Sequence, residues 1–457
     1  MRRKFLQLIV LTFVLSDCGF KPKSASETKA DAVARRILGP AQSLSSSDIS
    51  VDQKLTIDSL KATRTLAWQT FARVVEAADL SITKPDATAI SVRIPKVFTW
   101  YSTEDVNRLL SFSLGQIPAV DLNAGLRLSP DQWTKSQAML DAELDTLPLP
   151  LQKKWVRFFE GMDKPQQADL IGLTGMNRVL FSPELIGSVA RQFADLQNCF
   201  PADIKPTSET PYKPCWSEAL PKTSVLIKTT WLNTESGFRS IATDAASLEK
   251  LMKNPDASWA DAALTQAAPS PEKILTATNA GRSFVLGGMH IMSKELDDWL
   301  WITAWWSADP DHDFGEDRPD FVQKLGAPWN QYKICAVSSY TQNRAELDAM
   351  EKDHPTLAAA YRAVLDETGA SWCSNPYIEK GAHNHKTNCI GCHQFAGTDV
   401  LQADVISGSD SVALRFPNLG RLKQRSDFPT DYIWAASQGQ TSWLDTLNSL
   451  RFRTDSP

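Results

Sequence analysis

The stretch that most constrains this chain is Cys389-Ile390-Gly391-Cys392-His393, near the C-terminus. Two cysteines separated by two residues and followed at once by a histidine are typical of covalent haem attachment. The thiols add to the two vinyl groups on one edge of the porphyrin, and the histidine binds the iron from below. The motif predicts Cys389 and Cys392 as thioether anchors and His393 as the proximal iron ligand.

The same five residues could also be a redox-active CxxC pair or one half of a zinc site. A redox-active CxxC pair needs no histidine, and half of a zinc site needs a second pair of ligands elsewhere in the chain. The sequence contains neither a second CxxC nor an HxxxH motif. We therefore favour haem over zinc.

The N-terminus predicts export. Residues 1–4 are positively charged at three positions, and residues 5–15 form an apolar run that is shorter than the ~20 residues of a membrane span. The run ends in Leu15-Ser16-Asp17-Cys18, which resembles the cleavage box of bacterial lipoproteins, although Asp17 stands where that box has a small neutral residue. We expect a periplasmic protein anchored to the membrane by lipid on Cys18. The alternative is ordinary secretion, with Cys18 removed.

The remaining cysteines form an even set in an oxidising compartment, which favours disulfides. Cys199 and Cys215 flank a Pro-rich loop, whose closure would contribute ~3 kcal/mol. Cys335 would then pair with Cys373 and connect a strand to the approach to the motif. Other pairings are left open by the sequence.

A chain of 457 residues is long enough for two or three domains. The expected fold class is α+β, with a helical N-terminal part, a Trp-rich antiparallel sheet in the middle and a small, mostly helical haem segment. The boundaries that we predict are 1–18 for the signal peptide, 19–50 for a flexible tether, 51–200 for the helical region, 201–370 for the β-rich region with its closing helix, and 371–457 for the haem segment.

Apolar periodicity predicts the individual elements. Helical spacing occurs at residues 53–78, 102–112, 129–147, 155–162 and 183–196, and again from 341 to 367 with an interruption at Pro355. A mixed pattern at 90–100 favours a strand, and short runs rich in Val, Ile, Trp and Thr predict strands at 224–231, 284–293, 299–307 and 332–340. Trp299, Trp301, Thr303 and Trp305 should share one face, either as core or as a stacking surface.

Charge and motifs exclude several classes of function. The net charge is −5 with both signs interspersed, so no basic stripe indicates a nucleic-acid partner. No Ser/His/Asp triad, P-loop or dinucleotide fingerprint occurs at suitable spacing.

The segment after residue 371 resembles a small c-type cytochrome. Residues 377–381 would be its first helix, Pro417 and Leu419 match its Pro-x-Leu segment, and residues 428–434 would start its final helix. The resemblance implies haem c as cofactor, electron transfer as function and a redox partner protein whose identity the sequence does not indicate. The larger N-terminal portion resembles no characterised family.

The chain differs from that family in its sixth iron ligand. The family usually supplies a Met that follows the motif, whereas no Met or His follows His393 here. His290 and Met292 should share one face of a strand, with Met289 on the other, and nearby glycines would let a flat ring approach. We expect His290 first and Met292 second. Lys423, or no ligand at all, are the alternatives, whereas four histidines (His312, His354, His383 and His385) suit other roles.

The sixth ligand decides the class of function. A filled iron exchanges one electron and does nothing else. An open iron would allow a peroxidase-like or other oxidoreductase activity, and a third hypothesis is a ligand-binding or partner-binding protein that uses haem as a sensor.

A second constellation follows the Trp-rich run. Asp309, Asp311, Asp313 and Asp320 fall at positions 1, 3, 5 and 12 of a calcium-loop pattern, but the glycine comes one place late. The sequence thus offers a possible calcium site. The alternative is a solvated Asp-rich turn whose carboxylates pair with Arg318.

Overall fold

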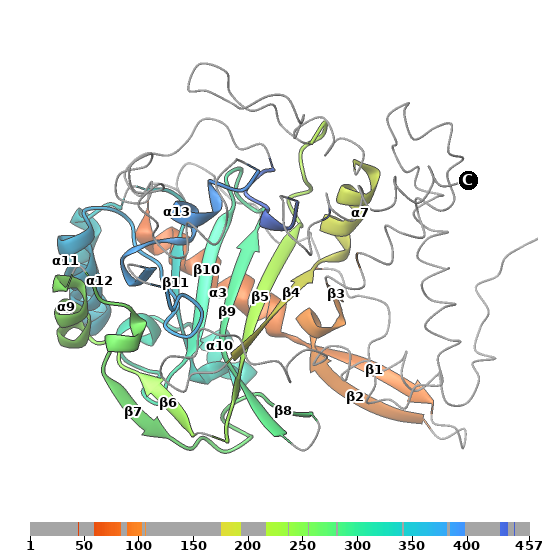
Figure 1. The fold of residues 1–457 in the computed structure, drawn as a ribbon, viewed down its shortest axis with the longest axis horizontal. Coiled ribbons are helices and arrows are strands. Elements are labelled where there is room, and N and C mark those ends of the chain that lie inside the picture. Colours follow the sequence, from red (N-terminus) through yellow and green to blue (C-terminus); the bar gives the residue numbers. More distant parts are fainter. Residues whose placement is uncertain are drawn as a thin grey trace, which may run out of the picture.

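The computed structural model describes residue 44 and residues 59–83, 89–102, 106, 175–192, 216–235, 237–254, 256–279, 282–340, 342–381, 384–397, 430–436 and 443. Within these ranges the chain is a mixed α+β structure in which helices pack on an antiparallel sheet (Figure 1). None of the helices in these ranges is long and apolar enough to cross a bilayer.

Seven of the described strands form one sheet, in the order β11-β10-β9-β5-β4-β3 with β8 added beside β9, and every neighbouring pair is antiparallel. Their bounds are β3 Tyr101–Ser102, β4 Gly175–Phe181, β5 Val225–Asn233, β8 Thr276–Asn279, β9 Arg282–Ser293, β10 Leu300–Trp306 and β11 Tyr332–Val337. The strands predicted at 224–231, 284–293, 299–307 and 332–340 are confirmed as β5, β9, β10 and β11. The sequence missed β3, β4 and β8.

Both faces of the sheet are covered, since all seven residues of β10 are buried. On one face, the helix α3 (Leu60–Val75) packs Phe71 against Tyr332 of β11, with ring centroids 6.2 Å apart. Directly paired residues of neighbouring strands point to the same face. Thr303, His290 and Lys228 are paired in this way across β10, β9 and β5, on the face opposite Tyr332.

The predicted tryptophan row is a core feature. Trp301 and Trp305 are 1% and 0% exposed, so they do not form an open stacking surface. Trp299 is also buried, but it precedes β10 and has a left-handed backbone with φ of 67°. The core-packing interpretation is therefore the one that the structure bears out.

The helices follow their sequence signals. Ser59 caps α3 by accepting from the Ala62 amide, and α3 ends at Val75, where Glu76 leaves the helical backbone and leads into β1. The helical pattern from 341 is split as predicted, with α11 ending at Asp353 and α12 starting on Pro355. The remaining bounds are β1 Ala77–Thr83, β2 Ala89–Pro95, β6 Phe238–Ile241, β7 Leu264–Ala267, α7 Pro183–Arg191, α9 Ala245–Lys253, α10 Asp320–Leu325, α11 Ala345–Asp353, α12 Pro355–Thr368, α13 Cys389–His393 and the 3-10 helices η1 Lys96–Thr99, η4 Trp259–Asp261, η5 Asp313–Gly315, η6 Trp329–Gln331, η7 Asn384–Lys386 and η9 Trp434–Ala436.

The helix expected at residues 377–381 is not formed. Asn375 instead donates from its side chain to Thr303 Oγ1 at 2.7 Å and to the Ala304 carbonyl at 2.9 Å, and its Oδ1 accepts from the Tyr377 amide. Tyr377 is buried, and its hydroxyl donates to the Arg239 carbonyl at 3.0 Å. These bonds to the sheet hold the segment in a turn, which is a tertiary effect that local periodicity does not report.

Other predictions lie outside the described residues. They are the signal peptide and tether, the helices at 129–147 and 155–162, most of that at 102–112, the Pro-x-Leu segment, and the sites Cys18, Cys199, Cys215, His383 and Lys423. Of the final helix expected at 428–434, the described residues 430–433 form a turn, and η9 follows. The region predicted as helical, 51–200, contains β1 to β4 as well as α3 and α7.

Candidate functional site

The five residues of the CxxCH motif form the short helix α13. Asn388 caps it by accepting from the Gly391 amide at 2.8 Å, and the same side chain donates to the Ser371 carbonyl at 2.9 Å. Residues three and four apart in a helix lie on the same side. Cys389, Cys392 and His393 therefore share one side, and both cysteines are free thiols.

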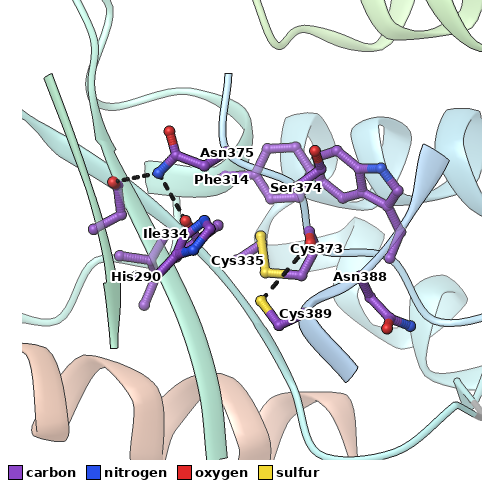
Figure 2. Close-up of a disulfide and its surroundings, with 12 residues drawn as sticks. His290, Phe314, Ile334, Cys335, Cys373, Ser374, Asn375, Asn388 and Cys389 are labelled. Carbon is purple, nitrogen blue, oxygen red and sulfur yellow. Dashed lines mark hydrogen bonds between the residues drawn. A yellow bond between two sulfur atoms is a disulfide. The ribbon is translucent and has the colours of Figure 1, made fainter. Parts of the chain in front are cut away.

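A disulfide lies directly beside the motif. Cys335 of β11 is bonded to Cys373, which confirms the predicted pairing, with 5.4 Å between the Cα atoms. Figure 2 shows Cys389 next to this bridge, with its sulfur 4.0 Å from the Cys373 carbonyl oxygen. The bridge thus connects the sheet to the segment that leads into α13, on the face that carries Thr303 and His290.

His393 has the arrangement of a metal-binding imidazole. Its Nδ1 lies 2.9 Å from the Tyr432 carbonyl oxygen, so Nδ1 carries the proton and donates it. Nε2 has no hydrogen-bond partner among the residues that the structure describes. Metal-binding histidines typically fix their orientation through such a bond from the other ring nitrogen.

The surroundings of the partly buried His393 favour its neutral form. Removal from water is the main cause that lowers the pKa of His393 to about 3. The hydrogen bond to the Tyr432 carbonyl opposes this shift, and the charges of His290 and Lys228 add to it slightly. The neutral imidazole is the form that binds a metal. The ring also packs 4.9 Å from the Trp301 ring, between centroids, which restricts its position.

His290 lies on the sheet face that meets His393, because Trp301 of the same face contacts the His393 ring. His290 lies in β9, near enough for its charge to act on His393. Its Nε2 is buried without a hydrogen-bond partner in the described ranges, and the nearest carboxylate oxygen, Oε1 of Glu379, is 3.6 Å away. Met292 is two residues after His290 in β9 and is paired with Trp301 of β10. Met289 points to the opposite face of the sheet, the one that α3 covers. His290 and Met292 thus share the predicted face.

The other described histidines have different surroundings. His312 is exposed, with Nδ1 2.6 Å from Asp309. His354 joins α11 to α12, and His385 is fully buried in η7.

Two charged residues of the site were missed from the sequence. Lys228 pairs with His290 across the strands, and burial lowers the pKa of Lys228 while Cys392 and Glu379 oppose this shift. Glu379 accepts a hydrogen bond from the Asn375 amide. Burial is the main cause that raises the pKa of the Cys389 and Cys392 thiols, and the negative charge of Glu379 is the second. The pKa of Cys392 rises to about 12. A lysine within the apolar run of β5 was the available clue to Lys228. Nothing local indicated Glu379.

The four carboxylates of the predicted calcium loop do not converge on one point, and three of them bond to separate basic side chains. Asp309 contacts His312, Asp311 accepts from Arg318 at 2.6 Å, and Asp313 accepts from Lys333 at 2.6 Å. Asp320 begins α10. In the described part of the chain, no group of three or more His, Cys, Asp or Glu side chains could hold a metal ion. Of the two alternatives, the geometry therefore favours an Asp-rich turn with a carboxylate paired to Arg318 over a calcium-binding loop.

Comparisons of the chain with protein-family models, with curated proteins and with solved structures found no match in any of the three. The inference of function therefore depends on the residues and geometry described above.

Proposed function

We propose that this chain is an exported monohaem c-type cytochrome that transfers electrons, tethered to the periplasmic side of the membrane through lipid on Cys18. The observation that carries the proposal is the state of His393. Its Nδ1 is held by the Tyr432 carbonyl, whereas Nε2 bonds to none of the residues described in the structure, on the same side of α13 as two free thiols. This donor set fits a covalently bound haem.

In this proposal, each residue of the site has a specific task. Cys389 and Cys392 would form the two thioethers, and His393 would supply the proximal nitrogen. The bound haem would supply a one-electron couple. The Trp301 ring restricts the imidazole of His393 at a centroid distance of 4.9 Å, and the Tyr432 ring packs in turn against Trp301 at 5.4 Å.

The decisive experiment uses the full chain produced in a host with a cytochrome maturation pathway. We expect the intact mass to exceed that of the processed polypeptide by one haem, and the reduced protein to show the absorption bands of a haem with two thioethers. A colourless protein at its peptide mass would exclude the proposal.

A second candidate function is an oxidoreductase with an open iron. The observation that favours it is the buried polar group of His290, Lys228 and Glu379 on the face that carries the motif. Such groups could bind a small oxidant beside the iron. The two functions differ in whether His290 occupies the sixth position.

We expect His290→Ala to convert a low-spin ferric haem to a high-spin one. The electron-transfer proposal with His290 as sixth ligand requires that the imidazole be coordinated, so its removal opens the iron and permits spectral changes with peroxide. Absorption and electron paramagnetic resonance spectra measure the change. His312→Ala is the matched control, because that ring is exposed and bonded to Asp309. A wild-type protein that is already high-spin and reacts with peroxide would favour the enzyme.

A further inference from the structure

The residue whose carbonyl holds His393 lies in a strained turn. The Ile433 amide donates to the Thr430 carbonyl at 3.1 Å, and the two central residues, Asp431 and Tyr432, have φ of 48° and 66°. Two left-handed central residues are the pattern of a type I′ turn, which favours Asn-Gly. A bulky residue such as Tyr432 rarely adopts this left-handed backbone, because its Cβ crowds the neighbouring carbonyl. The surroundings must therefore hold the turn in place.

The side chain of Asp431 provides that hold. Its carboxylate lies 2.9 Å and 2.7 Å from Lys294 Nζ through its two oxygens, and Oδ1 also accepts from Trp299 Nε1 at 3.0 Å. Lys294 is 8% exposed and lies over the Trp299 ring. Hydrogen bonds of this charged, sheltered kind are stronger than neutral ones. They attach the turn to the connection between β9 and β10.

The other side of the turn faces the site. The Tyr432 carbonyl accepts from His393 Nδ1, and the Tyr432 ring meets Trp301 edge to face. The direction of that carbonyl depends on the backbone of the turn, and the turn is fastened by Asp431. A bond from Nδ1 sets both the orientation and the basicity of a metal-binding imidazole.

We propose that Asp431 is a positioning residue for the proximal histidine: with Lys294 and Trp299 it fixes the turn whose carbonyl orients the His393 ring. The redox consequence rests on the proposed function. A more basic imidazole favours the ferric iron, so loss of the anchor should raise the reduction potential. Asp431 itself makes no contact with His393 in the structure's described interactions.

Two substitutions separate the anchor from the backbone. Asp431→Gly adopts the left-handed conformation readily but has no side chain to bind Lys294 or Trp299. Asp431→Asn tolerates the same conformation and keeps one acceptor oxygen. At a fixed solution potential, we expect the ratio of ferric to ferrous protein to be about fivefold to tenfold lower in Asp431→Gly than in the wild type. A tenfold change in this ratio corresponds to a rise of ~59 mV in the one-electron reduction potential. Asp431→Asn should restore most of the wild-type value.

The matched control is Asp366→Asn, which removes an exposed carboxylate from its ion pair with Arg344. It should leave the potential unchanged. A second readout is the ¹⁵N NMR spectrum of labelled histidine in the reduced protein, where His393 should keep its Nδ1 proton in the wild type and exchange between environments in Asp431→Gly.

The outcomes separate the two proposals. If haem is bound and Asp431→Gly matches the wild type in potential and in the His393 resonance, the positioning role is wrong and the cytochrome proposal stands. If the wild type carries no haem, the cytochrome proposal is wrong, and the His393 resonances of the same two proteins still decide whether Asp431 orients the ring.

Discussion

Replacement of both Cys389 and Cys392 by alanine is expected to abolish covalent haem. Each thiol can supply one thioether, so the double variant has no covalent attachment, and any haem held by His393 alone should be lost on denaturation. Each single variant should keep one thioether and show a shifted reduced spectrum. Haem staining on a denaturing gel and the intact mass measure both effects, and the expected loss in the double variant is complete.

The control for this experiment removes two other cysteines. Cys335→Ala with Cys373→Ala breaks the neighbouring disulfide but leaves both motif thiols, so covalent haem should persist in the folded fraction. Cys335 and Cys373 contribute to stability by closing a long loop, typically ~2–4 kcal/mol, which a thermal scan would detect separately. Full haem content in the Cys389/Cys392 double variant would refute attachment at the motif.

The second large effect concerns Arg64 of α3, whose guanidinium is buried at the junction of α3, β11 and η5. Its Nε and Nη2 donate to the two oxygens of Asp317 at 2.6 Å and 2.5 Å, and Nη1 donates to the Ile334 carbonyl at 2.8 Å. The side chains of Arg64 and Asp317 are 1% and 15% exposed. Removal of one partner of a buried ion pair leaves the other charge uncompensated.

We expect Arg64→Met to lower the free energy of unfolding by ~3–5 kcal/mol, the range for a broken buried pair. Urea denaturation followed by circular dichroism measures the change. Arg362→Met is the control, since that half-buried arginine pairs with the exposed carboxylates of Asp348 and Glu351, and its loss should lower the free energy of unfolding by under ~1 kcal/mol. The double variant Arg64→Met with Asp317→Leu should recover part of the loss. Equal effects at Arg64 and Arg362 would contradict the prediction.

The pair also sets a dependence on pH. Burial alone would raise the pKa of the Asp317 carboxyl, but the Arg64 charge and the bonds from Arg64 and Trp68 lower it below its ordinary value of 3.8. A carboxyl with a lowered folded pKa stabilises the fold above its unfolded pKa, and this stabilisation is lost as the pH falls through the folded value. The difference between wild type and Arg64→Met should therefore shrink below about pH 3.8.

The sequence alone determined the features that depend on neighbours in the chain. The spacing of the motif puts its two thiols and imidazole on one side of a helix turn, and Pro355 splits a helix because its ring cannot continue the preceding one. Runs of Val, Ile and Trp predicted β5, β9, β10 and β11 because a doubly covered strand is apolar throughout. The even number of cysteines predicted disulfides, but the sequence left several pairings open, and the fold decided that Cys335 bonds to Cys373.

Only the tertiary structure decided which distant groups meet. Tyr432 supplies a carbonyl to His393, and Asp431 reaches Lys294 across 137 positions, because burial forces polar groups to find partners wherever the fold places them. Glu379 lies beside His290 because Asn375 is bonded to β10, which also prevented the expected helix at 377–381. Local periodicity reports which side of an element is apolar. It does not report what that side will contact.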